Sequence, residues 1–97
     1  MATLHVLSAS PFTDGRLGSC LRVLGPGDGL LLCGEAVQAL RPGTEIFTRL
    51  ARLSSAKLYA LMEDCQARSL KTEAAQQLDY PAFVELSLAY DRVNTWL

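Results

Sequence analysis

The run Gly-Leu-Leu-Leu-Cys at 29–33 constrains the fold more than any other part of the sequence. Its apolar residues do not alternate with polar ones, so a strand at this position needs cover on both of its faces. The Gly-Pro-Gly-Asp stretch before it stops any preceding helix, and Gly34 follows it directly. Strands of this kind lie inside parallel sheets that carry helices on both sides. The run therefore predicts an α/β fold.

Short apolar segments alternate with helical ones along the rest of the chain. The predicted strands are 3–8, 29–33, 56–62 and a short one near 77–79. The predicted helical segments are 17–24, 35–40, 46–53, 63–70 and 80–88. This alternation implies right-handed βαβ connections. At 97 residues the chain is long enough for one core, so we predict a single domain over 1–97. Its architecture is a small three-layer sandwich with a mainly parallel sheet flanked by helices.

Composition excludes several classes of function. The formal net charge of −1 provides no basic surface, so we expect no direct contact with nucleic acid. The longest apolar run, Leu-Leu-Leu-Cys, is far short of the roughly 20 residues that a membrane span requires. The N-terminal residues lack the basic and apolar regions of a signal peptide. Three cysteines fit no closed disulfide framework. These features predict a cytoplasmic protein without a membrane partner.

Conventional catalytic and cofactor motifs are missing from the sequence. The Gly-Pro-Gly-Asp-Gly stretch at 25–29 lacks the order of a dinucleotide-binding loop and precedes a strand instead of following one. The cysteines have no paired spacing, and His5 is the single histidine, so we expect neither a metal nor another cofactor. The pair Glu63-Asp64 is typical of a solvated helix start and is not read as an acid/base pair.

Cys33 and Cys65 each admit two interpretations. Reactive groups in parallel sheets gather beyond the carboxyl ends of the strands, which predicts chemistry in the turns after Ser8, Cys33 and Met62. Cys33 ends a buried strand, where it is either a site residue or a small apolar plug. Cys65 lies near a helix start, where the helix dipole lowers a thiol pKa, but the acidic residues beside it raise the pKa. The pattern does not decide between a functional role and a packing role for either cysteine.

Cys20 lies in the apolar stripe of the first predicted helix. Leu17, Cys20, Leu21 and Leu24 share one helical face, which favours core packing. Cys20 is about seven residues into its helix, or roughly 10 Å. His5 is about three residues from the end of the first strand, again roughly 10 Å. The two side chains are therefore predicted at similar depth, although the pattern for His5 itself favours a hydrogen-bonded core histidine.

The order of several motifs resembles that of the TusB/DsrH family of sulfur-relay subunits, which belongs to the DsrE/DsrF/DsrH superfamily. The motifs are LHVLSASPF (4–12), the helix that carries Cys20, GDGLLLC (27–33), KLYALMEDCQARSL (57–70), DYPAFVELS (79–87) and the late Trp96. The resemblance covers essentially the whole chain. It implies a small parallel sheet between helices, the fold that the strand pattern predicts independently.

The resemblance also implies a function and a set of partners. The chain would join TusC-like and TusD-like subunits in a hetero-oligomer with two copies of each. That complex would accept persulfide sulfur from a TusA-like donor and pass it to a TusE-like acceptor for 2-thiolation of the tRNA wobble uridine. One alternative is a DsrH-type subunit of a DsrE-DsrF-DsrH-like complex in dissimilatory sulfur oxidation. Another is an interaction-only domain without sulfur chemistry.

The family's cysteines match this chain only in part. DsrH-type chains carry a cysteine in the first helix, and Cys20 falls on it, which implies an auxiliary persulfide carrier. The helix-opening cysteine of TusD-like chains would fall near Leu61 or Met62, and neither is a cysteine. Cys33 and Cys65 match no family cysteine. The resemblance therefore implies that this chain is not the main catalytic subunit.

Half of the chain is apolar (49%), which predicts an uncovered apolar patch that binds partner subunits. The segment from Tyr90 to Leu97 is predicted to form part of that patch. We expect the isolated chain to self-associate and its partners to replace that state.

Overall fold

The computed structural model describes residues 2–52, 57–71 and 74–96. In chain order the elements are β1 (Thr3–Leu7), α1 (Arg16–Val23), β2 (Gly29–Leu32), the 3₁₀ helix η1 (Gly34–Leu40), α2 (Glu45–Ala51), β3 (Lys57–Leu61), α3 (Met62–Ala67), β4 (Gln76–Leu78), α4 (Tyr80–Ala89) and β5 (Arg92–Trp96). The strands form one five-stranded sheet in the order β4-β3-β2-β1-β5. All four pairings in it are parallel. The predicted fold class is confirmed.

β2 occupies the centre of the sheet, and this position accounts for its sequence. All four of its residues are buried. Leu30 and Leu32 pack against one side of the sheet, and Leu31 packs against the other. Gly29 leaves room for the end of α4, because a Cβ at this position would overlap the Tyr90 hydroxyl. The non-alternating run therefore forms a strand covered on both faces, as predicted, over Gly29–Leu32, and Cys33 lies just beyond its end.

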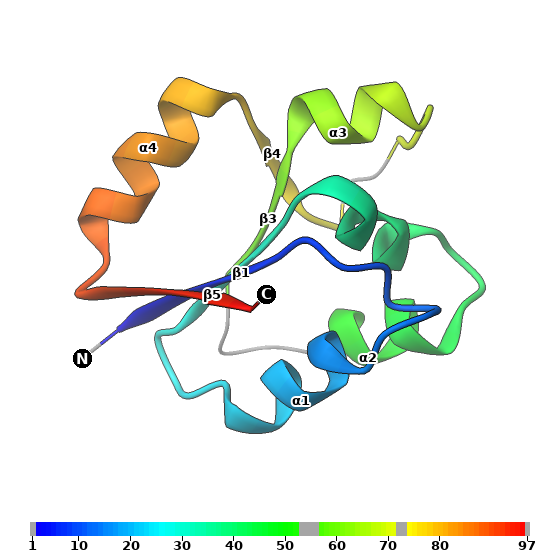
Figure 1. Ribbon diagram of the computed structural model, residues 1–97, viewed down its shortest axis with the longest axis horizontal. Helices are drawn as coiled ribbons and strands as arrows, with labels where there is room; N and C mark the ends of the chain where they lie inside the picture. The colour runs from blue at the N-terminus through cyan, green and yellow to red at the C-terminus, as the bar shows by residue number, and fades with distance from the viewer. Residues whose placement is uncertain (1, 53–56, 72–73, 97) are drawn as a thin grey trace.

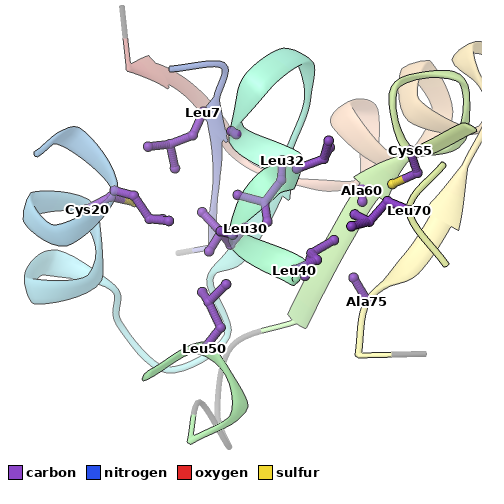
Figure 2. Close-up of a cluster of buried hydrophobic side chains, with 14 residues drawn as sticks. Leu7, Cys20, Leu30, Leu32, Leu40, Leu50, Ala60, Cys65, Leu70 and Ala75 are labelled. Carbon is purple, nitrogen blue, oxygen red and sulfur yellow. The ribbon is translucent and has the colours of Figure 1, made fainter. Parts of the chain in front are cut away.

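Two clusters of buried side chains lie on opposite sides of the sheet. The large core takes its helical residues from α1, η1, α2 and α3, and it contains both Cys20 and Cys65 (Figure 2). The α4 core is smaller, with buried members Leu4, Val6, Leu31, Tyr59, Leu61 and Leu78. In Figure 1, α4 stands on one side of the sheet, and α1 and α2 lie on the other. The sheet is thus covered unequally.

The structure corrects the reading of the C-terminal segment, which contains a strand that the sequence pattern did not predict. β5 pairs with β1 in parallel, with Asn94 opposite His5 and Trp96 opposite Leu7. Four of its five residues are exposed because it lies at the edge of the sheet. An exposed edge strand carries no alternating apolar signal, so periodicity could not reveal it.

Other element boundaries differ by a few residues from the predictions. α3 ends at Ala67 instead of continuing to Leu70, and Ser69 beyond it has a positive φ of 51°. Asp79 caps α4 by accepting the backbone N–H of Ala82, and Pro81 lies in the first turn. Residues 53 and 56, the end of one predicted helix and the start of a predicted strand, fall outside the described residues. No helix in the described part of the chain has the length and apolar character to cross a membrane.

Candidate functional site

The carboxyl ends of β1 and β2 meet where the sequence predicted chemistry. The Cys33 backbone N–H donates to the Leu7 carbonyl oxygen at 2.9 Å, and the Cys33 Sγ donates to the same oxygen at 3.4 Å. Gly34 follows with a positive φ of 53°, and a Cβ there would lie 3.3 Å from the Ser8 carbonyl oxygen. This tight turn suits glycine. Cys33 is left half-buried, the least buried of the three cysteines.

Asp64 and Arg68 link α3 to the turn after β2. The Gly34 N–H donates to Asp64 Oδ2 at 2.7 Å. Arg68 donates to Glu35 Oε1 at 2.6 Å, and its Nη1 donates to the Asp64 carbonyl oxygen at 3.1 Å. Asp64 therefore holds the backbone of the carboxyl edge in place, while Glu63 is exposed to solvent. The two acids have separate roles, which agrees with a helix start and not with an acid/base pair.

Burial keeps the thiols of Cys33 and Cys65 protonated. Desolvation is the largest cause of the raised pKa of Cys33, and the negative charge of Asp64 adds to it. Cys65 is fully buried in the large core. Desolvation raises its pKa most, Asp64 raises it further, and Arg68 opposes them. Desolvation and the charge of Asp64 outweigh the dipole expected at a helix start. That dipole is weak because α3 has only six residues.

Cys20 projects from α1 toward the strands of the large core and has no exposed surface (Figure 2). Burial, followed by the negative charge of Asp28, raises its pKa to about 11. At pH 7 this raised pKa keeps the Cys20 thiol protonated. In this conformation Cys20 is a neutral core residue that a second protein cannot reach.

His5 is held between two partners on the same side of the sheet as the large core. The Trp96 Nε1–H donates to His5 Nδ1 at 3.1 Å, and His5 Nε2 lies 3.4 Å from Asp28 Oδ2. One neutral tautomer, with its hydrogen on Nε2, satisfies both contacts. The predicted hydrogen-bonded core histidine is confirmed. Both ring nitrogens are engaged, so His5 has none free to activate Cys20.

Asp28 is the buried charge that the sequence reading missed. Its Oδ2 accepts the Gly25 N–H at 2.9 Å, and its Oδ1 accepts the Thr3 N–H at 3.0 Å. These two hydrogen bonds, in that order, are the largest causes that lower its pKa, and the contact with His5 lowers it further. The Gly-Pro-Gly-Asp-Gly pattern predicts only a helix breaker at Asp28 and does not indicate a buried charge. A single acidic residue immediately before a buried strand was the available signal.

A hollow in the described part of the surface lies apart from the thiols. It measures about 280 Å³ and is lined by Pro11, Phe12, Thr44, Glu45, Ile46 and Arg49. No cysteine lines it. Across residues 2–52, 57–71 and 74–96, no three His, Cys, Asp or Glu side chains are grouped as metal ligands. The geometry defines a small parallel α/β protein whose three thiols are protonated.

Comparison with known proteins places this architecture in a family. The sequence model described as "DsrH like protein" matches residues 9–93. Protein TusB of Pectobacterium parmentieri is 33% identical over 96 residues, covering 96% of this chain and 99% of that protein. Protein TusB of Escherichia coli strain E24377A is 36% identical over 97 residues, with the same coverage. The chain belongs to the DsrH-like/TusB family.

Solved structures support the fold independently. The crystal structure of the ychN protein from E. coli superimposes with a TM-score of 0.80 at 18% identity, covering 99% of this chain and 100% of that one. A conserved protein from Bacteroides thetaiotaomicron, BT1422, gives a TM-score of 0.67 at 15% identity. At these identities the likeness concerns the fold alone.

Proposed function

We propose that this chain is a cytoplasmic, single-domain subunit of a sulfurtransferase complex, assembled with TusC-like and TusD-like chains. The complex relays persulfide sulfur from a TusA-like donor to a TusE-like acceptor for 2-thiolation of the tRNA wobble uridine. Membership of the TusB/DsrH family implies a subunit of a sulfur-relay complex. The observation that carries the finer proposal is the near full-length identity to proteins called TusB.

The thiol geometry supports an accessory role in this relay. Persulfide transfer requires a thiolate that a second protein can reach. Burial raises the pKa of all three cysteines, and two of them are fully buried. The main transfer cysteine is therefore assigned to a partner subunit. Cys20 serves at most as an auxiliary carrier, and only in a conformation in which α1 exposes it.

One feature favours the DsrH-type alternative in dissimilatory sulfur oxidation. DsrH-type chains carry a cysteine in the first helix, and Cys20 falls at that place in this chain. Tus-type chains can lack this cysteine. An interaction-only domain is the remaining alternative, because the described thiols are protonated.

Deletion of the gene followed by mass spectrometry of bulk tRNA tests the proposal. We expect loss of wobble 2-thiouridine, restored by the wild-type chain, and co-purification of TusC-like and TusD-like subunits with the tagged protein. Normal thiolation together with impaired sulfur oxidation would instead support the DsrH-type alternative. Normal thiolation, normal sulfur oxidation and no sulfur on the purified complex would leave the interaction-only domain.

The proposal also assigns tRNA contact to another protein of the pathway. A chain of net charge −1 has no basic stripe for the phosphate backbone. We expect no salt-dependent, sub-micromolar binding of tRNA by the isolated chain in filter binding. Such binding would contradict this part of the proposal.

A further inference from the structure

His5 and Trp96 are the single histidine and the single tryptophan of the chain, and their side chains are in contact. Trp96 ends β5, and His5 lies in the middle of β1, the strand beside it (Figure 1). The Trp96 Nε1–H donates to His5 Nδ1 at 3.1 Å. An indole N–H is a donor only, so His5 accepts this hydrogen bond only while its Nδ1 carries no proton.

The other ring nitrogen of His5 faces a carboxylate. His5 Nε2 lies 3.4 Å from Asp28 Oδ2, and both residues are buried. Asp28 keeps its negative charge because the N–H groups of Gly25 and Thr3 lower its pKa. A protonated imidazole carries a hydrogen on both nitrogens. Protonation of His5 therefore strengthens its contact with Asp28 and turns a second donor toward the Trp96 N–H.

No charged side chain other than His5 and Asp28 is buried in the described part of the chain. Uncharged residues occupy the buried face of α1 and the positions of β2 and β5 that pair with His5: Leu17, Cys20 with its protonated thiol, Leu30 and Asn94. The charged residues of α1 and of the start of β5 are exposed: Arg16, Arg22, Asp91 and Arg92. The two contacts of His5 therefore favour opposite charge states, since Trp96 requires the neutral ring and Asp28 favours the protonated one.

The contact with His5 holds the carboxyl end of β5. Trp96 is half-buried and packs against the large core, whereas the other four residues of the strand are exposed. β5 is an edge strand whose one neighbour is β1. Its start is held separately, because Asp91 Oδ2 accepts the Ala2 N–H at 2.9 Å and the Asp91 N–H donates to the Ala2 carbonyl oxygen at 3.1 Å.

We propose that His5 is a pH-dependent switch for the carboxyl end of β5: neutral His5 binds Trp96, and protonated His5 releases Trp96 and pairs with Asp28. The proton comes from solvent and adds to Nδ1. Histidine changes charge between about pH 5 and pH 8, so Trp96 is held at the upper end of this range and released at the lower end. This switch does not depend on the proposed function in sulfur relay.

The indole N–H resonance of Trp96 tests the proposal in the full-length chain, because no other tryptophan contributes a signal. In ¹H–¹⁵N correlation spectra it should move upfield between about pH 8 and about pH 5.5, as the hydrogen bond to His5 is lost. Acrylamide quenching of Trp96 fluorescence should increase about twofold over the same range, since a half-buried side chain becomes exposed. Both changes should reverse when the pH is raised.

Replacement of the titrating group separates this switch from a general effect of pH. His5→Asn offers an amide oxygen near the position of Nδ1 and does not titrate, so both signals should stay constant. His5→Gln is a second non-titrating variant for the case in which His5→Asn does not fold. Asp91→Asn is the matched control at the other end of β5 and should keep the wild-type response. Far-UV circular dichroism at each pH verifies that the chains remain folded.

A wild-type indole resonance that stays constant between about pH 8 and about pH 5.5 would overturn the proposal, as would an equal response in the folded His5 variants. Loss of the circular dichroism signal together with the Trp96 response would overturn it as well, because the signal would then report unfolding of the whole chain. The tRNA thiolation assay can succeed or fail independently of this result, so the two proposals are tested apart.

Discussion

The two sides of the β-sheet differ in how completely their helices are covered. On one side, α1, η1, α2 and α3 bury apolar residues in the large core, and Cys20 and Cys65 are enclosed among them. On the other side, α4 alone covers the sheet and has no buried residue. The first side holds the fold together and keeps its thiols from solvent. The second side leaves apolar side chains of α4 exposed, so the two sides of the sheet should contribute unequally to stability.

Truncation of equivalent leucines on the two sides should give the largest difference. Leu30→Ala leaves a cavity in the large core and should lower the free energy of unfolding by about 2–5 kcal/mol. Leu88→Ala removes an 80% exposed side chain and should change it by less than about 0.5 kcal/mol. Urea denaturation followed by circular dichroism, at a concentration low enough to keep the chain monomeric, measures both. Equal losses would remove the distinction between the two sides.

Asp28→Asn should lower the free energy of unfolding by about 1–3 kcal/mol at pH 7. An amide keeps one acceptor oxygen but turns an NH₂ group toward the N–H of either Gly25 or Thr3, so one donor loses its partner. The folded pKa of Asp28 is lowered, so its stabilisation is present above its unfolded pKa of about 3.9 and is lost as the pH falls through the folded value.

The difference between wild type and Asp28→Asn should therefore shrink at low pH in urea denaturation. Asp79→Asn is the control, because asparagine caps a helix as well as aspartate does. A difference that stays constant down to pH 2 would contradict the assigned role of the carboxylate.

Thiol reactivity should follow burial. With iodoacetamide at pH 7, Cys33 should be alkylated at least about tenfold faster than Cys20 or Cys65, because only Cys33 is partly exposed. In the assembled complex, Cys20 should also react more slowly than the cysteine of the TusD-like subunit. Peptide mass spectrometry over time gives the rates, and urea should make them similar. Fast labelling of native Cys20 would show that the large core opens readily.

The smallest effect is expected for Cys20 in sulfur relay. Cys20→Ser should lower wobble 2-thiolation in cells only mildly, whereas removal of the TusD-like cysteine should abolish it. Persulfide on each cysteine, measured by mass spectrometry after incubation with a loaded donor, checks the assignment directly. Abundant persulfide on Cys20, together with complete loss of thiolation in Cys20→Ser, would make this chain a primary carrier.

Local sequence patterns determined most of the fold because each pattern belongs to a single element. The unbroken apolar run at 29–33 required a strand with two covered faces, and β2 is that strand. Asp79 and Pro81 marked the start of α4 through capping and a fixed φ. The stripe through Cys20 marked the buried face of α1, and the structure places Cys20 there with no exposure.

Tertiary structure alone decided the features that depend on distant partners. β5 is a strand because it pairs with the edge of β1. Its own residues are mostly exposed and show no apolar periodicity. Trp96 reaches His5 across 91 positions of sequence, a distance over which no local pattern carries information. The raised pKa of Cys20 depends on complete burial near the charge of Asp28, which lies on another element. Periodicity reports which face of an element is apolar, but desolvation and charge depend on what that face meets.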